Sequence, residues 1–261
     1  MPVLVFKDEL SPDNFVYQAE LPEISAQKYL VADINNNFVF LQNNQSEKIP
    51  FAGFSQVLSS LVATDYINIE KNITLNTAIY NGVKSSRVKA DSTITPFDLL
   101  HLSLRGNDNT SLKIFANYLS EKRFTRLMND KAIAVGMKQS VFTLDENENT
   151  SYTRPEDLFY LSKYIYHNRK FLFEITAGKR TNSAYSKSIF ADVPNESIFM
   201  DKNSFVGGKV IAQSDGSKSF FGVFEIRIKN ETRPIFVYFG NSTNLEGEVT
   251  KTLDYIQQSY Q

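Results

Sequence analysis

Few side chains in this sequence could carry covalent or metal chemistry. The 261 residues contain no cysteine and only two histidines, His101 and His167. The lack of cysteine excludes disulfides, thiol catalysis and cysteine-bound zinc, and two histidines are too few for a histidine-rich metal site. They also argue against a Ser-His-Asp triad, which needs a histidine among partner residues. We expect both histidines to be structural or surface residues, and we expect no metal and no cofactor.

Serine and lysine chemistry is the remaining possibility. Ser55 and Ser60 lie in a stretch rich in small residues, and Lys209 lies in a strand-like run beside Gly207 and Gly208. The two glycines do not indicate a phosphate-binding loop, because no helix and no Lys-Ser or Lys-Thr pair follows them.

The overall composition excludes several classes of protein. The net charge is -1, with 28 basic and 29 acidic residues, so there is no electrostatic case for binding nucleic acid or an anionic membrane. No apolar run reaches the roughly 18 residues that a transmembrane helix needs. At 42% hydrophobic and 22% charged residues, the composition is that of a globular protein with a sizeable core.

Strands are expected near both ends of the chain. Strand-like runs at 29–34 and 38–41 flank three asparagines, which tolerate the positive φ of a hairpin turn. Further strands are expected at 205–213, 220–228 and 235–239. We expect early and late strands to form one antiparallel sheet.

Helices are expected between these strands and after them. Small residues all round the 54–64 segment indicate a helix buried among neighbours. Thr95 with Pro96 and Asp98 is typical of a helix start, and the same device is expected at Thr153. Further helices are predicted over 112–119, over 124–132 and ending near residue 136, and over 245–256. The predicted fold is α+β, with helices packed on the sheet.

No internal repeat, low-complexity linker or break in composition divides the chain. Residues 1–22 are polar and broken by Pro12 and Pro22, which predicts an irregular leader. Residues 23–261 are predicted to form a single domain.

Five short phrases, in their order and spacing, resemble segments of one known family: residues 21–33, 49–63, 93–109, 127–137 and 152–158. The family is that of the penicillin-binding D-alanyl-D-alanine carboxypeptidases, and the likeness runs from about residue 21 to 258. The resemblance implies the transpeptidase-like fold that these enzymes share with β-lactamases. It also implies a cell-wall peptide as the type of substrate.

The chemistry of that family needs three motifs. A serine nucleophile and a lysine three residues later lie on one face of a helix, where the amine takes the hydroxyl proton. A Ser-x-Asn motif lines the other side of the cleft, and a Lys-Thr-Gly on an edge strand binds the terminal carboxylate of the substrate.

All three motifs are degenerate here when the resemblance is carried over residue by residue. The nucleophile becomes Gly53 and the base lysine becomes Gln56. In the second motif the serine becomes Arg105, while Asn107 remains. The third motif becomes Val206-Gly207-Gly208. The resemblance therefore implies the fold, whereas the catalytic pair is missing.

Replacement residues were considered for each lost group. On a helix Ser55 lies about 200° round from Gly53, and Ser60 lies roughly 10 Å farther along the axis. Both are interpreted as packing residues. Strand alternation places Lys209 on the opposite face from Val206, so Lys209 cannot replace the lost cation without a bulge. We interpret it as a solvated strand lysine.

Arg105 is the one gain at the motif positions. It could pair with a carboxylate in the cleft, or it could fold back onto Asp108 or reach solvent. Asn107 and Asp108 are interpreted mainly as residues that fix the loop backbone. Arg105 and Asn107 are the candidate binding residues.

Three functions remain open from the sequence. The first is an inactive carboxypeptidase-like protein that serves as a binding or interaction module, for a peptidoglycan peptide or for an envelope protein. The second is an active serine hydrolase with rearranged motifs, and the third is a structural subunit of an envelope assembly. The resemblance implies an extracytoplasmic protein, secreted or anchored through a segment absent from this chain.

Overall fold

The computed structural model describes residues 20–260, apart from 145–149 and 195–196. Most of the predicted leader, residues 1–19, therefore lies outside the described residues. Residues 20–22, the part of it that is described, have no regular secondary structure.

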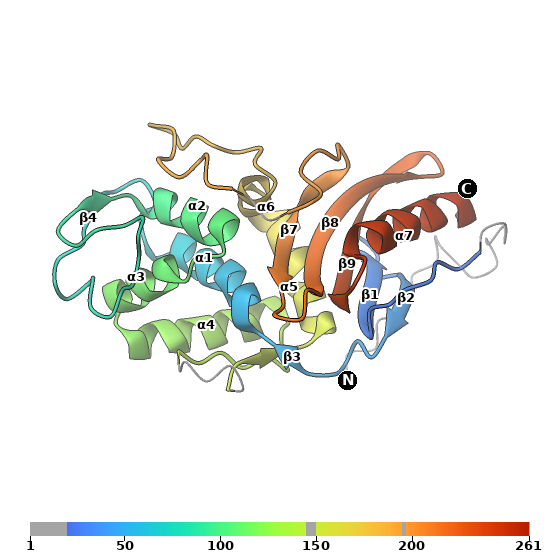
Figure 1. The fold of residues 1–261 in the computed structure, drawn as a ribbon, viewed down its shortest axis with the longest axis horizontal. Helices are drawn as coiled ribbons and strands as arrows, with labels where there is room; N and C mark the ends of the chain where they lie inside the picture. Colours follow the sequence, from blue (N-terminus) through green and yellow to red (C-terminus); the bar gives the residue numbers. More distant parts are fainter. Residues whose placement is uncertain (1–19, 145–149, 195–196, 261) are drawn as a thin grey trace.

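A five-stranded antiparallel sheet forms the centre of the fold, in the strand order β2-β1-β9-β8-β7 (Figure 1). The strands are β1 (Lys28–Asp33), β2 (Val39–Asn43), β7 (Phe205–Ala212), β8 (Lys218–Ile228) and β9 (Glu231–Ser242). The predicted hairpin forms between β1 and β2, and Asn37 in its turn has a φ of 62°. Because β1 also pairs with β9, strands from the two ends of the chain share one sheet, as expected.

Helices fill the chain between β2 and β7 and follow the last strand. They are α1 (Ser55–Tyr66), α2 (Pro96–Gly106), α3 (Thr110–Leu119), α4 (Glu121–Val135), α5 (Pro155–Asn168), α6 (Phe171–Thr176) and α7 (Leu245–Ser259). A short 3-10 turn, η2 (Ala52–Phe54), leads into α1. Two minor ribbons join β3 (Ile49–Pro50) to β6 (Tyr152–Thr153) and β4 (Ile73–Thr74) to β5 (Thr93–Ile94).

Both faces of the sheet are buried, and each face has its own hydrophobic core. Successive side chains of a strand point to opposite faces. Phe221 and Val223 of β8 accordingly join the larger core with α1 and α5, whereas Phe220 and Phe224 join a second core with α7. In Figure 1, α7 lies across β8 and β9, and α1 to α4 lie beyond the β7 edge. The observed α+β architecture agrees with the prediction.

Local sequence signals explain some helix ends. The side chain of Thr95 accepts a hydrogen bond from the backbone N–H of Asp98, and Asp98 bonds back to the Thr95 N–H, which completes the predicted capping box. Gly136 ends α4 with a φ of 103°, a left-handed conformation that glycine adopts without strain. The helix start predicted at Thr153 is wrong in detail. Thr153 belongs to β6, and α5 begins at Pro155 after Arg154, with no side-chain cap.

Asp98 does more than cap α2. Its Oδ2 accepts from the Thr95 hydroxyl at 2.5 Å, and its Oδ1 accepts from the Ser188 hydroxyl and the Ile189 backbone N–H, both at 2.9 Å. The carboxylate, which is buried, therefore holds the segment after α6 against the start of α2. Loss of a buried acceptor leaves its donors unsatisfied, which is costly.

We expect Asp98→Ala to lower the free energy of unfolding by about 2–4 kcal/mol, since it removes a cap and several buried hydrogen bonds together. Denaturant unfolding measures this loss. Asp254→Ala, at an exposed position of α7, is the matched control and should change stability little. Equal effects of the two substitutions would contradict the role given to Asp98.

Candidate functional site

Gly53 lies in η2, immediately before the first turn of α1. A β-carbon placed on Gly53 would stand 2.9 Å from Cδ1 and 3.0 Å from Cγ1 of Ile211, which belongs to β7. Such distances are shorter than van der Waals contact. The space into which a side chain at position 53 would project is therefore filled by Ile211.

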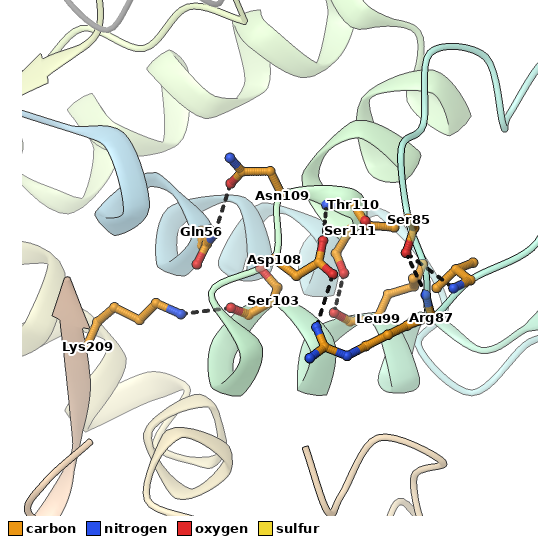
Figure 2. Close-up of polar contacts among 11 residues, drawn as sticks. Gln56, Ser85, Arg87, Leu99, Ser103, Asp108, Asn109, Thr110, Ser111 and Lys209 are labelled. Carbon is orange, nitrogen blue, oxygen red and sulfur yellow. Dashed lines mark hydrogen bonds and ion pairs between the residues drawn. The ribbon is translucent and has the colours of Figure 1, made fainter. Parts of the chain in front are cut away.

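Gln56 is buried, with 2% of its surface exposed, and its side chain turns toward the start of α3. Its Nε2 donates to Oδ1 of Asn109 at 2.9 Å (Figure 2). Its Oε1 has no hydrogen-bond partner among the described residues. An amide neither gains nor loses a proton near neutral pH, so Gln56 links α1 to the loop before α3 and offers no base.

Arg105 neither reaches solvent nor folds back onto Asp108, two of the three arrangements considered for it. Its guanidinium is buried under the segment after α6, where Nε donates to the backbone carbonyl of Val193 at 3.2 Å. It neither faces Gly53 nor folds back onto Asp108, whose carboxylate is 3.5 Å from Arg87. Burial lowers the pKa of Arg105, and the charge of Asp192 opposes this shift. Arg105 therefore braces a loop.

Asn107 caps the C-terminal end of α2 in a left-handed conformation, with a φ of 47°. Its Nδ2 donates to the backbone carbonyl of Val210 in β7 at 3.2 Å. Asp108 fixes the local backbone, because its Oδ1 accepts from the Thr110 N–H at 2.7 Å. The local role expected for this pair holds for Asp108, whereas Asn107 joins the loop to the sheet.

Lys209 is not the solvated lysine that we expected. It is 2% exposed, and its ammonium donates to the backbone carbonyl of Ser103 at 2.8 Å (Figure 2). It also donates to the backbone carbonyl of Leu104 at 3.1 Å. These carbonyls lie near the C-terminal end of α2, where a cation is favoured. The strand register shifts between Phe205 and Gly207, so the bulge that strand alternation demanded is present ahead of Lys209.

The other β7 positions meet α6. A β-carbon on Gly207 would collide with the backbone of Phe173, and the Gly208 N–H donates to the Thr176 hydroxyl at 2.9 Å. Val206 is buried in the larger core. The β7 residues that meet Gly53 and Asn107 are therefore Ile211 and Val210, next to Lys209, and the placement of the third motif at Val206-Gly207-Gly208 stays a prediction.

Ser55 and Ser60 are both buried, with 6% and 0% of their surfaces exposed. The Ser60 hydroxyl has no hydrogen-bond partner among the described residues. Burial on α1 agrees with their interpretation as packing residues. The sequence analysis did not identify Ile211. Because residues two apart in a strand point to the same face, Ile211 faces the same side of β7 as Lys209, and this alternation was the signal that could have identified it.

The two histidines differ in burial. His101 is completely buried in α2, and its ring makes an edge contact with Phe97 at 4.9 Å between centroids. Burial, together with the charge of Arg105, lowers the pKa of His101 to about 4. His167 is exposed near the end of α5. Neither is placed to act on a substrate at Gly53.

A sequence model of the peptidase S11 family, described as D-alanyl-D-alanine carboxypeptidase, matches residues 15–220. The chain belongs to this family. A D-alanyl-D-alanine endopeptidase of Escherichia coli is 27% identical over 129 residues, which are 48% of this chain and 42% of the relative. The match thus spans less than half the length of that curated relative.

Solved structures of carboxypeptidases and penicillin-binding proteins share the fold. A D-alanyl-D-alanine carboxypeptidase of Mycobacterium tuberculosis superposes with a TM-score of 0.75 and 20% identity, covering 92% of this chain and 94% of that one. Penicillin-binding protein 6B of Escherichia coli gives a TM-score of 0.72 and 16% identity, with 93% and 80% covered. The penicillin-binding, β-lactamase-like fold expected from the resemblance is confirmed.

The described residues were also compared with the requirements of a membrane-spanning helix and of a metal site. No helix among them is long and apolar enough to cross a membrane. Within the same part of the chain, no three His, Cys, Asp or Glu side chains group as metal ligands would. The activity for which the family is named, D-alanyl-D-alanine carboxypeptidase, is one on peptidoglycan peptides of the cell wall.

Lys209→Met should lower the free energy of unfolding by about 1–3 kcal/mol, because it keeps most of the buried stem and leaves the Ser103 and Leu104 carbonyls without the ammonium. Denaturant unfolding at neutral pH measures the change. Lys251→Met, at an exposed position of α7, is the control and should be nearly neutral. An unchanged free energy of unfolding in Lys209→Met would show that the ammonium is not needed between β7 and the end of α2.

Stability should fall as the pH drops from about 6.5 to about 4. The folded-state pKa of His101 lies below its unfolded value, so over this window the unfolded chain binds more protons and its population rises. The contribution is about 1–3 kcal/mol. His101→Leu should flatten this part of the pH profile, whereas His167→Leu should leave most of it. An unchanged profile in His101→Leu would contradict the buried neutral histidine.

Proposed function

We propose that this chain is a catalytically inactive member of its family that acts as an interaction module at the cell envelope. The observation that carries the proposal is the contact at Gly53. The position that should hold the nucleophile has no side chain, and Ile211 occupies the space where one would project.

The remaining motif positions support the same conclusion. The position of the base is Gln56, which cannot take a proton from a hydroxyl and whose amide N–H donates to Asn109. We assign the third motif to Lys209-Val210-Ile211 in place of Val206-Gly207-Gly208, on the basis of proximity to Gly53 and Asn107. Only its lysine is retained, and the ammonium is directed at helix carbonyls of the same chain.

The edge of β7 also argues against a bound peptide in this seam. An extended peptide that adds to an edge strand bonds to outward-pointing backbone groups. Two such groups are already used by this chain, because the Gly208 N–H donates to Thr176 and the Val210 carbonyl accepts from Asn107. This chain therefore closes the edge of β7 at two alternate residues, Gly208 and Val210.

This closure favours an envelope protein over a peptidoglycan peptide as the partner. The partner would meet another surface of the domain, since the motif seam is engaged internally. A structural subunit of an envelope assembly would also bind its partner through such a surface, and it is the alternative form of this proposal. The proposed location is extracytoplasmic, as for the enzymes of the family.

The decisive experiment incubates the purified protein with a fluorescent penicillin and records the intact mass beside an active carboxypeptidase of the family. We expect no adduct on this chain while the control is labelled, because no nucleophile stands at position 53. A stoichiometric adduct would overturn the proposal and favour an active enzyme with rearranged motifs. Peptide mapping would then show whether Ser55 or another hydroxyl had reacted.

Binding to a peptide that ends in D-Ala-D-Ala separates the two kinds of partner. Calorimetric titration of the wild-type chain with this peptide should give no heat of binding. Saturable binding would instead identify a peptidoglycan peptide as the ligand and contradict the choice of an envelope protein.

A further inference from the structure

We propose that Ile211 is a built-in occupant of the old nucleophile position, and that it excludes both ligands and any restored side chain at residue 53. This inference rests on the proposed function, because it concerns the same site. It goes further by naming one residue that closes the seam and by predicting that Gly53 and Ile211 are coupled.

The geometry of β7 makes Ile211 hard to displace. Within the strand Ile211 pairs with Ser219 of β8, and its side chain packs against the larger core. The residue before it is tied to the helices through the Val210 carbonyl and Asn107, and Lys209 is tied through Ser103 and Leu104. The β7 backbone is therefore held by β8 on one side and by the helices on the other, so the strand cannot easily move away from Gly53.

The Ile211 side chain has limited freedom at χ1. A β-branched residue in a strand has few χ1 rotamers, so Cγ1 cannot move far from a neighbour without strain, whereas Cδ1 can still turn about χ2. Both Cδ1 and Cγ1 of Ile211 would lie within 3.0 Å of a β-carbon at residue 53. A methyl at position 53 and the isoleucine at position 211 therefore compete for one space, so the first is tolerated only when the second is shortened.

The same competition applies to a nucleophile restored at residue 53. The β-carbon of a serine or cysteine there meets the Ile211 side chain. Shortening Ile211 to alanine removes the atoms that make the close contacts and opens the path to residue 53.

The absence of cysteine from the sequence allows a direct test by thiol labelling. Gly53→Cys is compared with Gly53→Cys/Ile211→Ala under native conditions, with iodoacetamide as the probe and total thiol measured in denaturant. We expect labelling to be at least about tenfold slower when Ile211 is present, since the thiol then reacts only after local opening. Equal rates would overturn the proposal.

A matched control separates local access from a general loosening of the fold. Ser186→Cys places a thiol on the exposed segment after α6, away from the seam. Its labelling rate should be the same with Ile211 and with Ile211→Ala. A comparable increase at Ser186→Cys would show that the alanine merely loosens the protein, and would overturn the proposal.

A double-mutant cycle covers the case in which Gly53→Cys does not fold. The wild type, Gly53→Ala, Ile211→Ala and the double variant are compared by thermal unfolding. We expect Gly53→Ala to lower Tm when Ile211 is present and to have a much smaller effect when residue 211 is alanine. Additive shifts would overturn the proposal. These readouts use no penicillin, so their failure is distinguishable from failure of the proposed inactivity.

Discussion

The fold depends on a sheet that is hydrophobic on both faces. Along β8, alternate phenylalanines enter the two cores, so neither face can be left to solvent. One layer is supplied by α1 and α5, and the other by α7, which returns at the end of the chain (Figure 1). This constraint brings the two ends of the chain into one sheet and leaves β7 as the edge that faces the helices.

The seam between β7 and the helices is where the motif positions that we propose to be degenerate make contacts within the chain. Lys209, Val210 and Ile211 each meet a different part of the helical half through an ammonium, a backbone carbonyl and an aliphatic side chain. These contacts join β7 to the helices through packing and hydrogen bonds within the chain, and they are the basis of the proposed inactivity.

Much of the fold could be predicted from sequence because its signals are local. Thr95 and Asp98 mark a helix start through hydrogen bonds three residues apart, and Gly136 marks an end through its own φ. The start of α5 was misplaced because Pro155 begins that helix without a side-chain cap, while Thr153 is taken by a strand. The short helix α6 was not predicted at all.

The candidate site was predicted unevenly, and the reason is distance along the chain. Gly53 and Gln56 could be identified as degenerate positions because the motif they replace lies within one helical turn. Arg105 was expected near the cleft, but Val193, 88 residues away, accepts its hydrogen bond under a loop. The burial of Lys209 depends on a bulge whose presence only the pairing of β7 with β8 decides.

The sequence by itself determined the family and the α+β architecture, and it predicted the loss of the serine and lysine pair. These follow from residue types and from spacings of a few residues, which local physics and the family resemblance both constrain. The tertiary structure alone decided that Ile211 fills the space beside Gly53 and that Lys209 is buried against α2. Those outcomes are set by contacts between strands and helices more than 100 residues apart, where small shifts in strand register decide which side chains meet.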